Sequence, residues 1–215
     1  MRRLLVVGAG AQARYVLNMV GLLKDAVVVG LIDSHENAQF WGRAILGATV
    51  LGGLAALEQV RPASDLELIV AVAELRRKRE LVQLLAGRGY RFRNAIHPSA
   101  VIAADVRMGE GCIVNSGVVI ENGAAVGDHV IIHAGSIIEH DNVLEDYVNI
   151  GPGVSTGGRV RFGEGAVVYT GASIIPDRIV GRESIVGAGA VVIRDVPQGA
   201  MVAGVPARVL RRGAT

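Results

Sequence analysis

The sequence predicts an α/β domain over residues 1–93 followed by a parallel β-helix over residues 94–215. Three observations predict this fold class. Apolar residues recur every six positions through the second half, and strand-like and helix-like segments alternate through the first. Glycine is abundant, at 29 residues, while aromatic residues make up only 4%. Without a collagen-like period, this composition favours a repetitive and turn-rich structure.

The first 93 residues alternate between short apolar runs typical of buried strands and longer segments of helical composition. A βαβ unit follows from this order, with a tight turn at residues 8–10 between the first strand and the first helix. The expected elements are strands at Arg3–Val7, Val27–Ile32 and Leu66–Val72, and helices at Ala11–Leu23, Leu54–Val60 and Glu74–Ala86.

The turn after the first strand carries a glycine pattern that suits a phosphate group. Gly8-x-Gly10-x-x-Ala13 follows a strand and opens a helix, and Asp33 ends the second strand about 20 positions later. Amides at a helix start can hold a pyrophosphate, and an acid at that distance can accept from a ribose hydroxyl. The alternative is a structural turn with Asp33 as a loop carboxylate. Because about 93 residues make only half of a dinucleotide-binding fold, a Rossmann-like site for a nucleoside diphosphate fits better than one for NAD.

The second half repeats with a period of six residues, which neither strands nor helices explain, since their periods are two and 3.6. The pattern is typical of a parallel β-helix, in which three short strands make one coil. About five and a half coils run from Ile96 to Arg194 without an inserted loop, so a functional site has to come from the coil faces. Thr156 is the one polar member of the repeated positions, which are Ile102, Met108, Val114, Ile120, Val126, Ile132, Ile138, Leu144, Ile150, Thr156, Phe162, Val168, Ile174, Val180, Val186 and Val192.

Composition and charge exclude several classes of partner. A formal charge of +2 is too small for a nucleic-acid footprint. No apolar stretch reaches membrane-spanning length, and the apolar run after Met1 is too short and too glycine-rich for a signal peptide. Cys112 is the only cysteine, and no Cys/His cluster has zinc-ligand spacing, so no metal is expected. A reducing, cytoplasmic location is the expectation.

His140 is the strongest candidate for acid–base chemistry on the coils. It lies two positions after Ile138, so it points outward, and Asp141 follows it directly. A neutral imidazole can take a proton from an amine or hydroxyl, and a neighbouring carboxylate can set its tautomer. A His-Asp pair by itself is most often solvated decoration, and the β-helix context is what favours a function. Of the other histidines, His35 and His97 are interpreted as structural, and His129 and His133 as bystanders.

Four segments together resemble the hexapeptide-repeat acyltransferases, and more narrowly the nucleotide-sugar N-acetyltransferases related to sialic acid O-acetyltransferases. They are Gly8–Ala13, Ile96-His97-Pro98, Ile138-Glu139-His140-Asp141 and Gly204-Val205-Pro206-Ala207-Arg208. The resemblance covers the whole chain. It implies a left-handed β-helix, acetyl-CoA as cosubstrate, His140 as general base and Asp141 as the acid that orients it. It also implies a homotrimer with acetyl-CoA in the groove between two subunits.

The resemblance also assigns ligand contacts, with two departures. It implies that the Gly158 amide meets the acetyl carbonyl, that amides near Thr170 and Ala188 meet the pantetheine, and that the segment at Pro206 covers the cofactor. Asn149 stands where the family often has a histidine that helps to place the acetyl group. Ala11-Gln12 stands where the family often has Gly-His, so Gln12 leaves the identity of the sugar nucleotide open.

The mechanism expected from these residues is direct transfer of the acetyl group, without a covalent acyl-enzyme. Cys112 occupies an inward-facing small slot and is interpreted as core, not as a nucleophile. N-acetylation of a nucleotide-linked amino sugar is the preferred function, and O-acetylation of a sialic-acid-type sugar is the alternative within the same class. A nicotinamide-dependent oxidoreductase and a non-catalytic scaffold are the alternatives from other classes.

Overall fold

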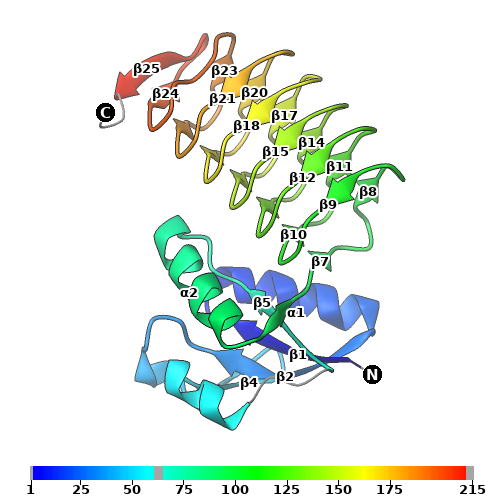
Figure 1. The fold of residues 1–215 in the computed structure, drawn as a ribbon, viewed down its shortest axis with the longest axis vertical. Helices are drawn as coiled ribbons and strands as arrows, with labels where there is room; N and C mark the ends of the chain where they lie inside the picture. Colours follow the sequence, from blue (N-terminus) through cyan, green and yellow to red (C-terminus); the bar gives the residue numbers. More distant parts are fainter. Residues whose placement is uncertain (1, 61–64, 212–215) are drawn as a thin grey trace. The chain divides into compact units, whose positions relative to one another are not determined.

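The computed structural model describes residues 2–60 and 65–211. The chain divides into two compact units, Met1–Pro98 and Ser99–Thr215, and each is described by itself (Figure 1). The boundary expected after residue 93 lies near the end of the first unit. Within the described residues, no helix has the length and apolar character needed to cross a membrane.

The first unit is built on a six-stranded sheet with the strand order β3-β4-β2-β1-β5-β6. Its central strand β1 pairs in parallel with β2 and β5, and its residues Leu4–Val7 are fully buried. The elements are β1 (Arg2–Val7), α1 (Ala11–Leu23), β2 (Ala26–Ile32), the 3-10 helix η1 (Ala38–Phe40), β3 (Ala44–Ile45), β4 (Ala48–Gly52), the 3-10 helix η2 (Leu54–Gln59), β5 (Leu66–Val70), α2 (Leu75–Gly87), β6 (Arg91–Phe92) and β7 (Ala95–Ile96).

Helices α1 and α2 and strands β1, β2 and β5 lie where the sequence places helices and strands. Two other segments differ from the expectation. The helix expected at Leu54–Val60 is a single 3-10 segment, η2, that starts after Gly53 and buries Ala56 and Leu57. The antiparallel hairpin of β3 and β4 was not expected. Its turn residues Leu46 and Gly47 both have left-handed φ angles, and a leucine at the first position hides the usual Asn-Gly hairpin signal.

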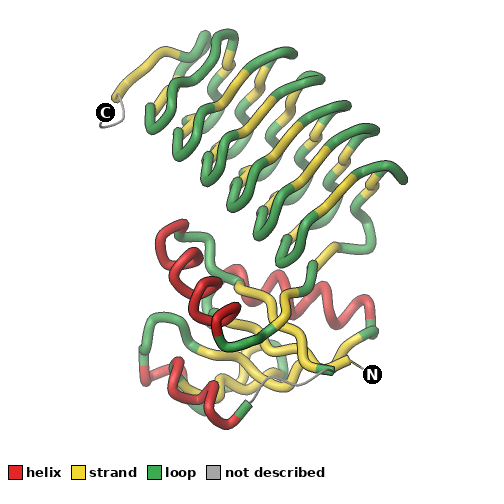
Figure 2. Tube along the Cα trace, viewed as in Figure 1, coloured by secondary structure: helices red, strands yellow, loops and turns green. Residues whose placement is uncertain are grey.

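The second unit is a β-helix, as predicted, whose coils consist of two-residue strands joined by corners (Figure 2). Each strand pairs in parallel with the strand 18 residues later, as Ile113 does with Ile131. Three sheets result, which we name after one strand of each.

The β16 face holds β10 (Ile113–Val114), β13 (Ile131–Ile132), β16 (Asn149–Ile150), β19 (Val167–Val168), β22 (Ile185–Val186), β24 (Met201–Ala203) and the antiparallel β25 (Arg208–Arg211). The β14 face holds β8 (Val101–Ile102), β11 (Val119–Ile120), β14 (Ile137–Ile138), β17 (Ser155–Thr156), β20 (Ser173–Ile174) and β23 (Val191–Val192). The β15 face holds β9 (Arg107–Met108), β12 (Ala125–Val126), β15 (Val143–Leu144), β18 (Arg161–Phe162) and β21 (Ile179–Val180).

The repeated apolar positions form the core of the β-helix, which confirms the six-residue register. From Val114 to Val192 every one of them is buried, including Thr156 at 4% exposure. The slot two residues earlier is also buried, and it holds Cys112, Ser136 and Asn142 among its members. Each coil therefore covers the aliphatic row of the next one, which leaves the outward positions free for other roles.

The corners need glycine for two different reasons. Gly127 and Gly163 follow core positions and lie so close to the next coil that a Cβ would come within 3.0 Å of its backbone. Other corner positions take left-handed backbone angles, and several of these are not glycine, with Asp141 at φ 58° and Arg159 at φ 59°. A corner can therefore display a functional side chain where its backbone bonds hold the turn.

Candidate functional site

His140 and Asp141 form a hydrogen-bonded pair on the corner between β14 and β15, which we call the His140 corner. The His140 Nδ1 lies 2.8 Å from the Asp141 Oδ2, and the two side chains are 47% and 58% exposed. The corner is held on both sides, because the Asp141 amide donates to the Asn122 carbonyl and the His140 carbonyl accepts from the Arg159 amide. The predicted pair is therefore formed, accessible and fixed to both neighbouring coils.

Two glycines make room for this pair. A Cβ on Gly158 would lie 2.3 Å from the His140 Nε2, so the imidazole occupies the space that a side chain at position 158 would need. A Cβ on Gly123, 18 residues before Asp141, would lie 2.4 Å from that residue's Oδ1. The sequence singled out Gly158 but not Gly123, although the same 18-residue step leads to both.

The arrangement equips His140 to act as a base. The carboxylate of Asp141 can only accept, so Nδ1 carries the proton of the neutral ring and Nε2 is left with a lone pair. On the following coils, Arg159 forms two hydrogen bonds with Asp177, at 2.7 and 3.0 Å. These bonds from the guanidinium lower the pKa of the Asp177 carboxyl. Because Arg159 is already paired with Asp177, Asp141 remains available to His140.

Two other histidines differ in what surrounds them. His129 is buried at 3% exposure and stacks on Tyr147 with 5.4 Å between ring centroids, which is a packing role. His133 hydrogen-bonds the side chain of Asn149. Burial lowers the pKa of His133, and the bond to Asn149 partly opposes that shift. The sequence analysis treated His133 as a bystander, and the structure instead links it to Asn149, the residue assigned to acetyl placement.

This buried histidine predicts a dependence of stability on pH. His133 has an ordinary pKa of 6.5 that folding lowers, so below that pH the unfolded chain binds the proton more readily. The free energy of unfolding is therefore complete above pH 6.5 and falls as the pH drops. In His133→Gln, urea denaturation at about pH 5 and about pH 7.5 should show a smaller difference than in the wild type. The exposed His35→Gln variant is the control, and an unchanged difference in His133→Gln would contradict the assignment.

The residues assigned to acetyl-CoA lie on a different part of the β-helix from the His140 corner. Thr170 and Ala188 are exposed at the corner between the β16 and β14 faces, 18 residues apart. Asn149 lies on the β16 face beside them, and Pro206 follows β24 of that face. Only Gly158 shares the His140 corner. Within one chain, the β14 face therefore separates the His140 pair from the other assigned cofactor residues.

In the first unit, the two glycines of the nucleotide loop have different surroundings. Gly8 has φ +128°, and a Cβ there would lie 2.6 Å from the carbonyl oxygen of Ala71, so its glycine is a structural need. Gly10 has nothing within 4 Å of a Cβ position and ends the loop as the N-cap of α1, without a side-chain cap. Ala13 is buried and packs in the core, and Gln12 is half-buried. The open space lies above Gly10.

A pocket of about 490 Å³ lies at this open helix start. Arg14 extends from the first turn of α1, and Phe40 and Arg43 come from the segment leading to the unexpected hairpin. Two arginines beside free helix amides give the pocket a strong preference for an anion. The sequence analysis missed these three residues, although Arg14 could have been found from its position one turn after Gly10.

Asp33 is buried at 3% exposure, and its carboxylate is engaged by its own loop. Its Oδ1 accepts from the His35 amide at 3.0 Å and its Oδ2 from the Asn37 amide at 2.6 Å. These bonds fix the loop that follows β2. A ribose contact by Asp33 stays a prediction, and it would use a lone pair that these amides leave over.

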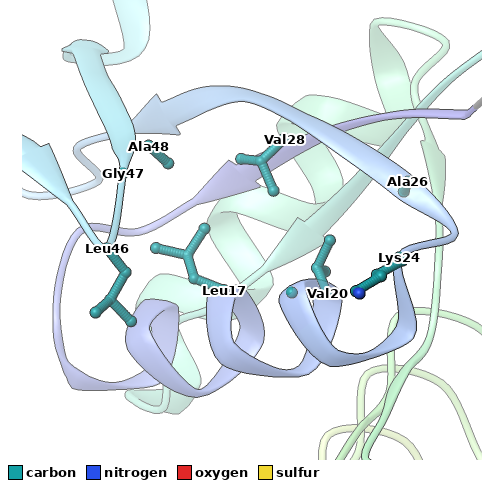
Figure 3. Close-up of a pocket in the computed structure, with 9 residues that line it drawn as sticks. Leu17, Val20, Lys24, Ala26, Val28, Leu46, Gly47 and Ala48 are labelled. Atoms are coloured by element: carbon teal, nitrogen blue, oxygen red, sulfur yellow. The ribbon is translucent and has the colours of Figure 1, made fainter.

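A second hollow in the first unit, of about 420 Å³, lies between α1, β2 and the hairpin turn (Figure 3). Leu17, Val20 and Val28 point into it, and Lys24 lies at its edge. Leu46 lines both hollows, so it stands between the apolar one and the arginine-lined one. The apolar hollow contains none of the predicted site residues.

Solved structures resemble the whole chain. A histidine-to-asparagine variant of perosamine N-acetyltransferase from Caulobacter crescentus, in complex with CoA and GDP-perosamine, is 34% identical, with a TM-score of 0.90 over 97% of both chains. The acetyltransferase domain of PglB from Neisseria gonorrhoeae, in complex with acetyl coenzyme A, is 31% identical, with a TM-score of 0.91 over 97% of this chain and 99% of that one. This chain belongs to the hexapeptide-repeat acyltransferases, among the nucleotide-sugar N-acetyltransferases.

Curated relatives support the acyltransferase class over the β-helix. Serine acetyltransferase 2 from Arabidopsis thaliana is 34% identical over 119 residues, which are 54% of this chain and 32% of that protein. The chain spans between 27% and 38% of the length of the curated relatives it matches. No protein-family model matches the chain.

For an acetyltransferase, a covalent route would need a nucleophile that the donor can reach. Cys112 is fully buried, and its thiol lies 3.1 Å from the Gly127 carbonyl oxygen, to which it donates. The predicted core role of Cys112 agrees with this environment. Among residues 2–60 and 65–211, no cluster of His, Cys, Asp or Glu is arranged to hold a metal ion.

Proposed function

We propose that His140 is the general base for transfer of an acetyl group from acetyl-CoA to the amino group of a nucleotide-linked sugar. The observation that carries the proposal is the exposed corner where Asp141 binds the His140 Nδ1 and where Gly158 leaves the Nε2 uncovered. The amine nitrogen attacks the thioester carbonyl, and the Nε2 takes the proton that the amine loses. The C–S bond then breaks, and the CoA thiolate leaves and recovers that proton from the imidazolium.

The first unit is proposed to hold the nucleotide in a Rossmann-like manner. The parallel order β4-β2-β1-β5-β6 and the open helix start at Gly10 support this assignment. The Gly10 region would bind the diphosphate through free amides of α1, assisted by Arg14 and Arg43. Gln12 and Asp33 are proposed to contact the nucleoside side of the ligand, while Gly8 and Ala13 keep the loop in place through close packing.

A homotrimer is proposed because one chain presents only part of the site. His140 and Asp141 lie on one edge of the β14 face, whereas Asn149, Thr170 and Ala188 lie at or beyond the other edge. A second copy of the chain could bring its cofactor residues to the His140 corner of the first, with Pro206 covering the bound acetyl-CoA. Sedimentation of a fully active monomer at micromolar concentration would contradict this assembly. We propose the cytoplasm as the location, because acetyl-CoA is available there and the cysteine is free.

The proposed acceptor site predicts a separation between the two substrates. In Arg43→Ala, the KM for the nucleotide sugar should rise about tenfold, because a charged contact to phosphate is worth about 1.5–3 kcal/mol. The KM for acetyl-CoA should stay unchanged. Release of CoA is followed with a thiol reagent, using GDP-perosamine first and then UDP- and CMP-linked amino sugars.

Arg88→Ala is the matched control, since Arg88 is a surface arginine of the same unit that pairs with Glu58. Both variants should leave the fold intact. An equal rise in both KM values for Arg43→Ala, or an equal effect in Arg88→Ala, would rule out the nucleotide pocket. Failure of every amino-sugar nucleotide to release CoA would rule out the proposed function itself.

A further inference from the structure

Two polar residues interrupt the apolar interior of the β-helix, and both lie directly beneath the His140 corner. Thr156 is the one polar residue in the core row, and Asn142 is the largest polar residue in the small slot. They are 4% and 0% exposed. A buried polar group costs free energy unless it is hydrogen-bonded, so the bonds of these two residues require an explanation.

The Asn142 side chain contacts the backbone on both sides of the site. Its Nδ2 lies 2.7 Å from the carbonyl oxygen of Glu139, the residue before His140, and 3.1 Å from that of Gly157, the residue before Gly158. Its Oδ1 accepts from the Val160 amide at 2.7 Å. One amide group therefore holds the turn that carries the imidazole together with the turn that leaves room for it.

Thr156 completes the same network. Its Oγ1 accepts from the Asn142 Nδ2 at 2.8 Å and from the Glu139 amide at 3.0 Å. It donates to the carbonyl oxygen of Ile137 at 3.3 Å. The amide and carbonyl of Glu139 are thus both held by buried side chains, which limits the positions available to the next residue, His140.

We infer that Asn142 and Thr156 are positioning residues, which set the distance and orientation of the His140 imidazole relative to Gly158 and to the bound thioester. The inference rests on the proposed role of His140 as base. It goes beyond that role by assigning its geometry to two buried residues that touch neither substrate. Displacing a catalytic group by about 1 Å can cost about a hundredfold in rate, so loosening this network should act on kcat.

Thr156→Val tests the inference, since it keeps the shape of the side chain and removes the hydroxyl. We expect kcat to fall about tenfold or more while both KM values change less than about twofold. Thr156→Ser keeps the hydroxyl and should restore kcat to within about threefold of the wild type. Asn142→Ser is the second variant, because serine already occupies the same slot at positions 136 and 184, so this substitution fits the coil. It should also lower kcat about tenfold.

Ser184→Ala is the matched control, because Ser184 is a buried hydroxyl of the same slot that donates to Gly181 and has no bond to the His140 corner. It should leave kcat within about twofold at comparable loss of melting temperature. The inference is wrong if Thr156→Val lowers kcat no more than Ser184→Ala, or if Thr156→Ser is as slow as Thr156→Val.

NMR of the His140 ring separates this inference from the proposed function. In Thr156→Val and Asn142→Ser, the ring signals and their change with pH should shift, while those of His35 should not. If His140→Ala keeps full activity but these shifts occur, the proposed base is wrong and the positioning network stands. If His140→Ala is inactive and the ring signals do not move in either variant, the base stands and the positioning inference is overturned.

Discussion

His140→Ala should lower kcat by about 10²–10⁴-fold, the usual contribution of a general base, while the KM values for acetyl-CoA and for the sugar nucleotide change little. The physical reason is that the side chain is removed from a transfer of a proton and not from a binding contact. Residual activity should remain, because holding both substrates together does not depend on the imidazole. Steady-state kinetics at saturating substrates measure this split.

The same substitution should leave the fold unchanged, since His140 is exposed on a corner and its backbone bonds to Arg159 remain. Asp141→Asn is the partner experiment and should reduce kcat less, because an amide can still accept from Nδ1 but stabilises the imidazolium poorly. The wild-type rate should rise between about pH 5 and about pH 8, as the imidazole loses its proton. Nearly full kcat in His140→Ala would direct the search for the base to His133.

Gly158→Ala should lower kcat by about ten- to a hundredfold with little loss of stability. The new Cβ would lie 2.3 Å from the His140 Nε2, and the half-exposed imidazole can move outward to relieve that clash. The displaced ring would no longer face the thioester. Kinetics and a melting curve on the same preparation test both halves of the expectation.

The neighbouring glycine supplies the control for this experiment. A Cβ on Gly157 would lie 2.6 Å from the ring nitrogen of Pro176, which cannot swing away. Gly157→Ala should therefore cost about 1–3 kcal/mol of stability through strain, with a smaller effect on kcat than Gly158→Ala at a temperature where both are folded. If the two variants showed the same ratio of activity loss to stability loss, Gly158 would have only a structural role.

The β-helix could be predicted in full because its periodic signal is local. Each core residue packs against its equivalent 18 positions along, as Ile132 does beneath Ile150, so the sequence itself encodes the register. The same step of 18 connects His140 with Gly158, and the pair with Asp141 is adjacent in the chain. These parts of the candidate site could therefore be predicted without knowledge of any distant contact.

The remaining parts depend on contacts that the sequence does not order. Phe40 and Arg43 reach the Gly10 pocket through a hairpin whose turn at Leu46-Gly47 lacks the usual hairpin residues. The link between His133 and Asn149 crosses from one coil to the next on the outer surface, where no periodic rule applies. Asn142 interrupts the small slot, so a search for small residues passes over it.

The two glycines around the His-Asp pair restrict where on the stack such a pair can stand. A histidine at position 158, one coil onward, would face Pro176 where His140 faces Gly158, and one at position 122 would meet His140 itself. The coils are interchangeable as packing units, yet their corners are not interchangeable as hosts for the pair. Duplication or deletion of a whole 18-residue coil away from residues 123–158 would thus lengthen or shorten the stack and leave the number of sites per chain at one.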